Sequence, residues 1–325
     1  MRILITGGCG FIGSHIAEYH LAKGDEVLVV DDLSTGSLDN IATFKDNPAF
    51  RFENASILNW PNVQESVLWA ERIYHMAAVV GVYRVLKDPI NVLTTNIHGC
   101  EKLLHAIAIT EHRPQVIVTS SSSVYGHSDN PMLSEKDDLL IKSSAHPLWN
   151  YALSKIADEA LGLAYYHSMK IPVTVIRLFN TIGPRQTGQY GMVVPRFIKQ
   201  ACTGEPITVF GDGTQTRSFC DVRDVLSALN LLANTPKSNG QIVNVGYDVE
   251  IVINDLAELI RKKANSNSKI QYIPYKEAYG EEITDIKQRR PDLTKLCQLT
   301  GFKHQWPLEK TIDDLIHTFK ANQQL

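Results

Sequence analysis

The sequence lacks the features that mark disulfide-bonded, membrane-spanning and nucleic-acid-binding proteins. Its five cysteines are scattered and form no C-x-x-C pair, which argues against a disulfide framework or a zinc knuckle. No apolar run approaches the roughly 18 residues that a membrane-spanning helix needs. The 32 basic and 35 acidic residues give a net charge of −3, which offers no basic surface to nucleic acid. We therefore expect no membrane, nucleic-acid or metal partner.

We also expect no leader segment, because the chain starts directly with a predicted strand. We therefore expect a cytoplasmic protein with reduced cysteines. Hydrophobic residues make up 44% of the 325 residues and charged residues 21%, as in ordinary globular proteins. A chain of this length can bury one large core or two smaller ones.

Short apolar runs alternate with amphipathic segments over the first half of the chain. This alternation predicts β-α-β units, and hence an α/β fold with a Rossmann-type, doubly wound parallel sheet. The strands read as nearly continuous apolar runs, which is typical of a sheet covered by helices on both faces. The expected elements are strands 2–6, 26–31, 50–53, 72–77, 115–120 and 173–178, and helices 12–23, 89–110 and 150–168.

Three glycines follow the first strand with the spacing G-x-x-G-x-x-G. Gly7 would permit a tight turn, Gly10 would let the backbone approach a pyrophosphate, and Gly13 would let the next helix pack closely on the strand. The helix N-terminus would then favour the negative charge of the phosphates. A glycine-rich loop without a ligand remains the alternative, since short glycine patterns have many false positives.

Two acids end the second strand, eighteen residues after Gly13. Asp31, followed by Asp32, is placed to accept hydrogen bonds from the ribose of an adenosine. No Lys or Arg lies between Asp31 and Leu38, so nothing in this loop favours a 2′-phosphate. The pattern therefore predicts NAD rather than NADP, with a solvated strand-end acid as the alternative.

Glycine and proline become frequent after about residue 180, which predicts a smaller, loop-rich C-terminal domain for the substrate. Later segments near 222–234 and 241–245 read as a helix and a strand that return to the main sheet. Helices are expected near 253–264 and 308–321. The predicted NAD-binding domain comprises 1–180 and about 222–247, and the substrate domain about 181–221 and 248–325.

Tyr151 and Lys155 are four residues apart and would share one face of a helix. A phenol ionises near pH 10, so forming its anion near neutral pH costs about 4 kcal/mol. A nearby ammonium and a cationic nicotinamide each lower such a pKa by roughly one to three units. The pair would then act as a general base; an ordinary surface helix turn is the alternative.

Four serines, Ser120 to Ser123, stand at the end of the fifth predicted strand. Their hydroxyls are positioned to hydrogen-bond a substrate hydroxyl and the tyrosine oxygen. A serine-rich turn that caps the next segment is the alternative interpretation.

Many ordered motifs together resemble the extended short-chain dehydrogenases/reductases that act on nucleotide sugars, over essentially the whole chain. The matching segments are Thr6–Gly13, Asp31–Gly36, His75–Ala78, Asn96–Gly99, Ser121–Gly126, Tyr151 with Lys155, Arg177–Asn180, Gly183–Arg185, Val209–Gly213 and Thr216–Arg217.

This resemblance implies a role for each matching residue. Tyr151 would be the base that removes the proton of the sugar 4-hydroxyl, Lys155 its electrostatic partner, and Ser121 a hydroxyl that bridges sugar and tyrosine. The implied cofactor-binding residues are Gly7, Gly10, Phe11, Ile12, Gly13, Asp31, Asp32, Ser34, Thr35, Gly36, Ser56, Ile57, Ala77, Ala78, Asn96, Tyr151 and Lys155. The implied substrate-binding residues are Ser122, Ser123, Asn180, Arg185, Val194, Val209, Phe210, Arg217 and Asp292.

The chain departs from the family after the third strand, where Ser56 takes the place of the usual acid. A serine hydroxyl still hydrogen-bonds the adenine, but more weakly than a carboxylate. We expect NAD binding to tolerate this change.

Three reactions can follow oxidation of a sugar at C4: reduction on the other face, loss of water, or loss of carbon dioxide from a C6 carboxylate. Related dehydratases carry Asp-Glu where Ser122 and Ser123 stand, and related decarboxylases typically carry Glu at the second position. A serine does not shuttle protons as a carboxylate does near pH 7. The sequence therefore predicts a UDP-sugar 4-epimerase, with decarboxylase and 4,6-dehydratase as alternatives.

The substrate is left open by the sequence. Arg185 is a candidate ligand for a C6 carboxylate, which favours UDP-glucuronate, although an arginine that ties down its loop is equally consistent. UDP-glucose and UDP-N-acetylglucosamine remain possible. The resemblance also implies a homodimer through helices 89–110 and 150–168. A non-catalytic NAD-binding relative is the alternative of a different class.

Overall fold

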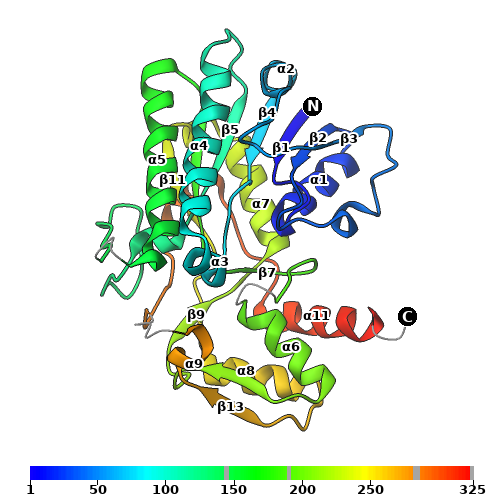
Figure 1. Ribbon diagram of the computed structural model, residues 1–325, viewed down its shortest axis with the longest axis vertical. Helices are drawn as coiled ribbons and strands as arrows, with labels where there is room; N and C mark the ends of the chain where they lie inside the picture. Colours follow the sequence, from blue (N-terminus) through cyan, green and yellow to red (C-terminus); the bar gives the residue numbers. More distant parts are fainter. Residues whose placement is uncertain (143–145, 189–191, 281–285, 323–325) are drawn as a thin grey trace.

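Two lobes of unequal size make up the molecule (Figure 1). The computed structural model describes residues 1–142, 146–188, 192–280 and 286–322. All of the site residues expected from the sequence lie within these ranges. The larger lobe contains the N-terminus and the main sheet, and the smaller lobe lies below it in the view of Figure 1.

A seven-stranded sheet forms the centre of the larger lobe, and all of its strand pairs are parallel. Its order, β11-β6-β5-β4-β1-β2-β3, places the first strand between β4 and β2. This topology confirms the predicted Rossmann-type fold. The strands are β1 (Arg2–Thr6), β2 (Glu26–Asp31), β3 (Phe50–Asn54), β4 (Arg72–His75), β5 (Gln115–Ser121), β6 (Val173–Leu178) and β11 (Gln241–Val245).

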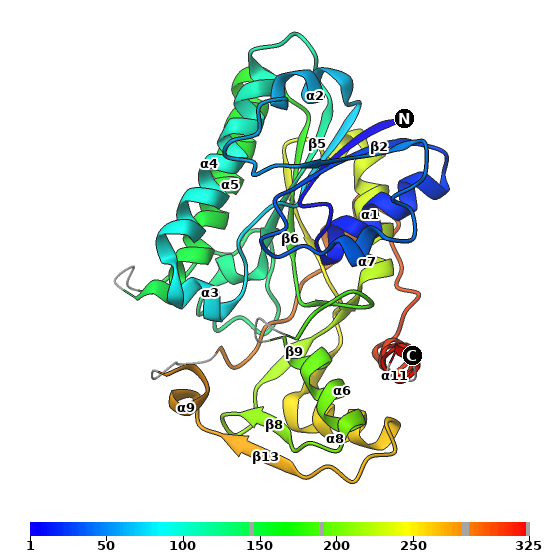
Figure 2. The ribbon, with the colours of Figure 1, turned by 45° about the vertical axis from the view of Figure 1, so that its right-hand side comes forward.

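Alternate residues of each strand point to opposite sides of this sheet, and helices cover both faces. Ile3 and Ile5 join a core with helices α1 and α7, whereas Leu4 joins a second core with α2 and α4. Figure 2 shows α4 and α5 on one side of the sheet and α1 and α7 on the other. The helices are α1 (Phe11–Ala22), α2 (Val63–Trp69), α3 (Val82–Lys87), α4 (Pro89–Ala108), α5 (Asn150–Met169) and α7 (Val222–Ala233).

The smaller lobe has its own apolar core, formed largely by α6, α8 and α11. The sequence placed α6 in a loop-rich region, although its buried Val194, Phe197, Ile198 and Ala201 follow helical spacing. Its helices are α6 (Val193–Thr203), α8 (Ile253–Lys263), α9 (Tyr275–Tyr279) and α11 (Leu308–Asn322). The short strands are β7 (Thr181–Ile182), β8 (Ile207–Phe210), β9 (Thr216–Ser218), β10 (Cys220–Asp221), β12 (Glu250–Val252) and β13 (Ile270–Ile273).

One late segment returns to the larger lobe. Helix α10 (Thr294–Thr300) contacts α7 and β11, and Leu293, Leu296 and Phe302 join the same core as α1. The sequence had assigned this segment to the substrate domain, since local pattern does not reveal which core an amphipathic helix joins. Among the described residues, no helix is both long and apolar enough to cross a membrane.

Candidate active site

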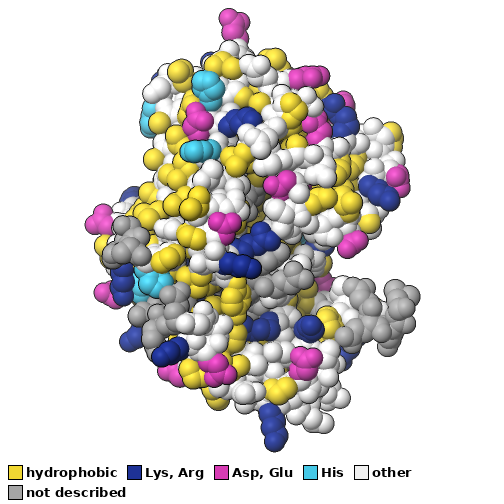
Figure 3. Space-filling model, in the orientation of Figure 1, with side chains coloured by type: hydrophobic (Ala, Val, Ile, Leu, Met, Phe, Trp, Pro, Cys, Tyr) yellow, Lys and Arg dark blue, Asp and Glu magenta, His cyan; other side chains and the backbone are white. Residues whose placement is uncertain are grey.

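A cavity of about 980 Å³ lies between the two lobes, at the carboxyl ends of the main strands. Figure 3 shows the surface hollowed between the lobes, with Lys and Arg side chains beside the hollow. In parallel α/β sheets, ligands bind at this edge. The predicted residues that line the cavity are Gly7, Gly10, Phe11, Ile12, Gly13, Asp31, Asp32, Ser34, Thr35, Ile57, Ala77, Ala78, Ser121, Ser122, Ser123, Tyr151, Lys155, Asn180, Arg185, Val194, Phe210 and Arg217.

The glycine turn has the geometry that a dinucleotide needs. Gly7 has φ +71°, and a Cβ there would lie 2.7 Å from the backbone nitrogen of Ala77, so a side chain does not fit. Helix α1 begins without a side-chain cap at Gly10. Its first N–H groups therefore remain available to phosphate oxygens at the cavity wall.

Asp31, the last residue of β2, lines the cavity and also holds the glycine loop. Its carboxylate accepts hydrogen bonds from the backbone N–H of Cys9 at 2.9 Å and of Leu33 at 2.8 Å. Burial raises the pKa of Asp31, while these two hydrogen bonds oppose the rise. The turn, the uncapped helix and this acid together fit an adenine dinucleotide.

Helix α5 carries the predicted base and its cation to the end of β5. Tyr151 and Lys155 both line the cavity. The Lys155 ammonium is buried and donates to the carbonyl oxygen of Thr119 and to Asp158 Oδ2, both at 2.9 Å. Ser121 Oγ donates to Ser123 Oγ at 3.1 Å, so the serine hydroxyls form one local group beside the tyrosine helix.

A buried ion pair fixes α5 against the sheet. Glu159 accepts two hydrogen bonds from Arg177 on β6, both at 2.8 Å, and a third from Ser120 Oγ on β5 at 2.6 Å. The bidentate geometry sets the position of the helix relative to both strand ends. Tyr151 and Ser121 are therefore presented from elements that are tied to each other.

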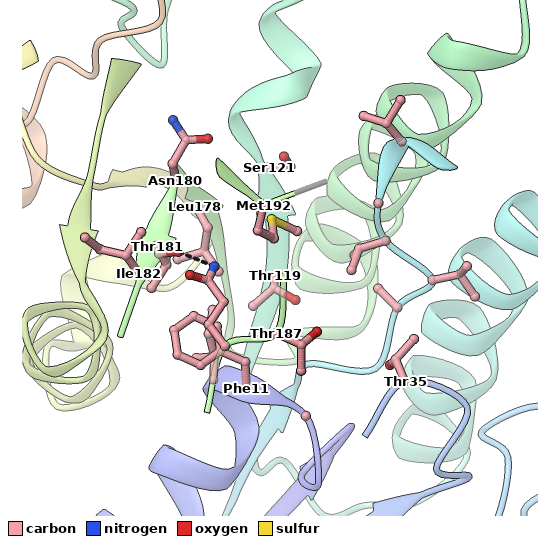
Figure 4. Close-up of a pocket in the computed structure, with 18 of the residues that line it drawn as sticks. Phe11, Thr35, Thr119, Ser121, Leu178, Asn180, Thr181, Ile182, Thr187 and Met192 are labelled. Carbon is pink, nitrogen blue, oxygen red and sulfur yellow. Dashed lines mark hydrogen bonds between the residues drawn. The ribbon is translucent and has the colours of Figure 1, made fainter. Parts of the chain in front are cut away.

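The segments after β6 form the opposite wall. In Figure 4, Asn180 and Ile182 stand across one space from Thr35, with Ser121 at the strand end above Thr119. The Asn180 amide donates to the carbonyl oxygen of Ser218 at 3.1 Å. The Arg185 guanidinium donates to Glu18 on α1 at 2.7 Å, which agrees with the alternative in which this arginine ties down its loop.

Five predicted site residues are not among those that line the cavity. Asn96 is buried behind it, where it hydrogen-bonds the backbone of Val79 and the hydroxyl of Ser154. The other four residues also have local partners. Gly36 packs on Asp31, and Ser56 accepts a hydrogen bond from the backbone of Leu58. Val209 lies in the apolar core of the smaller lobe, and Asp292 lies at the start of α10.

The comparison with protein families decides the classification. Residues 3–246 match the NAD dependent epimerase/dehydratase family. The chain belongs to this family. Its members use NAD, which confirms the cofactor predicted from the glycine turn and Asp31. The protein is accordingly an enzyme of the group that contains nucleotide-sugar epimerases, decarboxylases and dehydratases.

Three similar proteins cover nearly all of this family member. It is 36% identical to the UDP-N-acetyl-alpha-D-glucosaminuronate decarboxylase of Bacillus cytotoxicus, over 98% of each chain. It is 34% identical to UDP-glucuronic acid decarboxylase 1 of Danio rerio, over 98% of this chain and 72% of that protein. The structure of UDP-glucuronic acid 4-epimerase from Bacillus cereus, in complex with UDP-glucuronic acid and NAD, matches with a TM-score of 0.87 and 28% identity, over 98% of this chain and 100% of that one.

The sequence analysis named Phe210 but missed the aromatic group that surrounds it in the smaller lobe. Tyr275 and Tyr279 stack with ring centroids 6.2 Å apart, and Tyr279 meets Phe210 edge to face at 5.5 Å. The Arg196 guanidinium lies 3.7 Å from the centroid of the Phe210 ring. All four residues line the cavity between the lobes. The sequence did not indicate Arg196, Tyr275 or Tyr279, because three separate segments bring them to Phe210.

Helix α3 links the two lobes beside the cavity, which the sequence also did not indicate. The Tyr83 hydroxyl donates to the carbonyl oxygen of Ala278 at 3.2 Å, and its ring lies 5.3 Å from that of Tyr279. The next residue, Arg84, donates to the carbonyl oxygen of Ser34 at 2.7 Å. One short helix thus contacts both the loop after β2 and helix α9.

Proposed function

We propose that this enzyme is an NAD-dependent decarboxylase of a UDP-uronic acid that acts through a 4-keto sugar. The observation that carries the proposal is the end-to-end similarity to the Bacillus cytotoxicus decarboxylase. The relative from Danio rerio is named for the same type of reaction. The cavity supports the step that all three candidate reactions share, which is oxidation at C4.

Tyr151 would remove the proton of the sugar 4-hydroxyl as bound NAD accepts the hydride from C4. The charge of Lys155 would stabilise the phenolate, and Ser121 would hydrogen-bond the sugar oxygen. Gly7, Gly10 and Asp31 would hold the dinucleotide at the other end of the cavity. The positions of these residues in one cavity support this division of roles.

The 4-keto uronate would then lose carbon dioxide without a further acid. The C6 carboxylate is β to the new carbonyl group, so the electron pair of the C5–C6 bond moves to the C4 oxygen as carbon dioxide leaves. Hydroxyl donors at that oxygen, Tyr151 and Ser121, would stabilise the enolate. A proton from water then adds to C5, hydride returns to C4, and Tyr151 would give its proton back to the C4 oxygen. The absence of a carboxylate at Ser123 therefore does not prevent the bond cleavage.

The aromatic group of the smaller lobe is the proposed site of the nucleobase. Phe210, Tyr275 and Tyr279 offer flat apolar surfaces, and Arg196 and Arg217 supply positive charge beside them for a diphosphate. Asn180, Ser122, Ser123 and Val194 would contact the sugar from the intervening walls.

A UDP-uronate 4-epimerase is the second candidate. It is favoured by Ser122 and Ser123, since neither supplies a carboxylate to protonate C5. The similarity to UDP-glucuronic acid 4-epimerase from Bacillus cereus agrees with it. Both candidates use the same substrate class. The decarboxylase loses C6, whereas the epimerase retains C6 and returns the hydride to the opposite face of C4.

Proton and ¹³C NMR on purified protein with NAD distinguish the two reactions. UDP-glucuronate and UDP-N-acetylglucosaminuronate, each labelled with ¹³C at C6, are incubated separately with the enzyme. Labelled carbon dioxide and a UDP-pentose would support the proposal. A 4-epimer that retains the label would overturn it in favour of epimerisation. Absence of any product, also with neutral UDP-hexoses, would favour a non-catalytic NAD-binding protein.

A further inference from the structure

A fully buried carboxylate lies one helical turn beyond the predicted catalytic lysine. We propose that Asp158 is a positioning residue that fixes the Lys155 ammonium and keeps it charged beside Tyr151. The role in catalysis rests on the proposed C4 oxidation, whereas the effect on Lys155 itself does not. Asp158 is 0% exposed and Lys155 is 1% exposed, so neither charge is screened by solvent.

The contacts of Lys155 define its position. An ammonium has three donors. One is bound by Asp158 Oδ2 and another by the carbonyl oxygen of Thr119, each at 2.9 Å. The acceptors come from α5 and β5, two elements that Glu159 also ties together. The third donor is thereby left for the cavity side, where Tyr151 and the cofactor are expected.

The charges that face Lys155 come from three elements. Tyr151 and Asp158 lie on α5, Cys100 on α4 and His75 on β4. Burial lowers the pKa of His75 to about 3 and raises the pKa of the Cys100 thiol, so both are neutral near pH 7. Asp158 therefore supplies the negative charge opposite the ammonium at that pH.

The ion pair has a predictable effect on the lysine. Burial lowers the pKa of Lys155, but the charge and hydrogen bond of Asp158, together with smaller contributions from Tyr151 and Cys100, leave that pKa above its ordinary value. Without Asp158, a fully buried ammonium loses its compensation, and such groups titrate up to several pH units below about 10.4. The lysine would then lose its charge within the range in which the enzyme is assayed.

Asp158 has no evident part in holding the helix to the sheet. That task falls to the adjacent Glu159, which binds Arg177 and Ser120. The carboxylate of Asp158 has two polar neighbours in this interior, the ammonium of Lys155 and the thiol of Cys100. Lys155 is the charged one of the two, so the ion pair with Lys155 is the principal interaction of Asp158.

The variant Asp158→Asn keeps the shape of the side chain and removes its charge. In the wild-type enzyme we expect kcat/KM to stay level as pH rises to about 10. In the variant we expect it to fall over this range, with an apparent pKa at least one unit lower. Glu101→Gln, an exposed position on α4, removes the same charge and serves as the control. If kcat/KM falls at the same alkaline pH in Asp158→Asn and in the wild type, the proposal is overturned.

Thermal unfolding of the chain without ligands tests Lys155 independently of turnover. If the folded-state pKa of Lys155 falls below its unfolded value in Asp158→Asn, stability rises with pH between those two values. The Tm deficit of the variant should therefore shrink from pH 7 to pH 9, and adding Lys155→Met should abolish this dependence. A pH-independent deficit would contradict the proposal. Asp158→Ser, which leaves room for water, replaces the variant if it does not fold.

A failure of the proposed function can be distinguished from a failure of the inference about Asp158. If the wild-type enzyme converts no UDP-sugar, the proposed function fails while the unfolding experiment still decides the effect of Asp158. If turnover occurs and neither measurement changes, the inference about Asp158 fails alone.

Discussion

The Arg185 guanidinium lies 2.7 Å from Glu18 Oε2, so the loop after β7 is tied to helix α1 of the larger lobe. The two side chains are 18% and 45% exposed, and partly exposed pairs contribute at most about 1 kcal/mol. We expect Glu18→Gln and Arg185→Gln to lower the free energy of unfolding by up to this amount, and the double variant by no more than either single change.

The same two variants separate a loop-tying role from recognition of the sugar carboxylate. If Arg185 ties down the loop, both variants should raise the KM for a UDP-uronate to a similar, small extent. If Arg185 binds the carboxylate, Arg185→Gln alone should raise KM strongly, and Glu18→Gln should not. Steady-state kinetics on both variants decides between these roles.

Removal of the Tyr151 hydroxyl should abolish turnover while leaving the fold intact. A positioned general base contributes roughly 10² to 10⁴ in rate, so Tyr151→Phe should lower kcat by at least this factor. Tyr125→Phe is a matched control, because that hydroxyl binds Asn244 in the interior, away from the cavity. Activity retained in Tyr151→Phe would remove Tyr151 from its assigned role.

The glycine turn should not accept a side chain at Gly7. An alanine there has an unfavourable positive φ and also meets Ala77. Gly24 has a similar φ of +81°, but nothing lies within 4 Å of its Cβ position, so Gly24→Ala reports backbone strain alone. We expect Gly24→Ala to cost about 1–2 kcal/mol and to keep NAD binding. Gly7→Ala should cost more and weaken NAD binding in calorimetric titration; equal behaviour would argue against the steric explanation.

The Glu159–Arg177 pair should be essential for stability. Both side chains are buried, at 4% and 3% exposure, and loss of one partner leaves the other charge uncompensated. Glu159→Gln should therefore destabilise the protein by about 3–5 kcal/mol in urea unfolding. Adding Arg177→Met should recover part of that loss. A single variant as stable as the wild type would show that the pair does not hold α5 on the sheet.

Helices α4 and α5 lie side by side on one face of the larger lobe, and we propose that they pair two copies of the chain (Figure 2). Light scattering at micromolar concentration should then give the mass of a dimer. Ile97→Asp, at a half-buried position of α4, should shift the mass toward the monomer. Leu68→Asp, an exposed position on α2, should not. A monomeric wild type would contradict the expectation.

The sheet could be predicted because buried parallel strands are apolar at nearly every position, so their pattern is local. The residues that line the glycine turn and the tyrosine helix followed from motifs for the same reason. Asn96 shows where this approach ends: its motif predicted a cofactor contact, but tertiary packing places it behind Val79. Arg196 and Tyr279 both reach Phe210 only through folding of the smaller lobe, and no local pattern encodes that proximity.

Helix α3 contacts the walls of both proposed ligand compartments. Tyr83 contacts helix α9 of the smaller lobe, and Arg84 contacts the loop at Ser34. Both side chains come from the same six-residue helix, so a ligand that displaces either contact acts on an element that also carries the other. The proposed reaction leaves the cofactor unchanged overall, so the keto sugar must stay bound until hydride has returned. If both contacts of α3 break together, the sugar and the cofactor loop would be released in one step. The keto intermediate would then stay bound until that step.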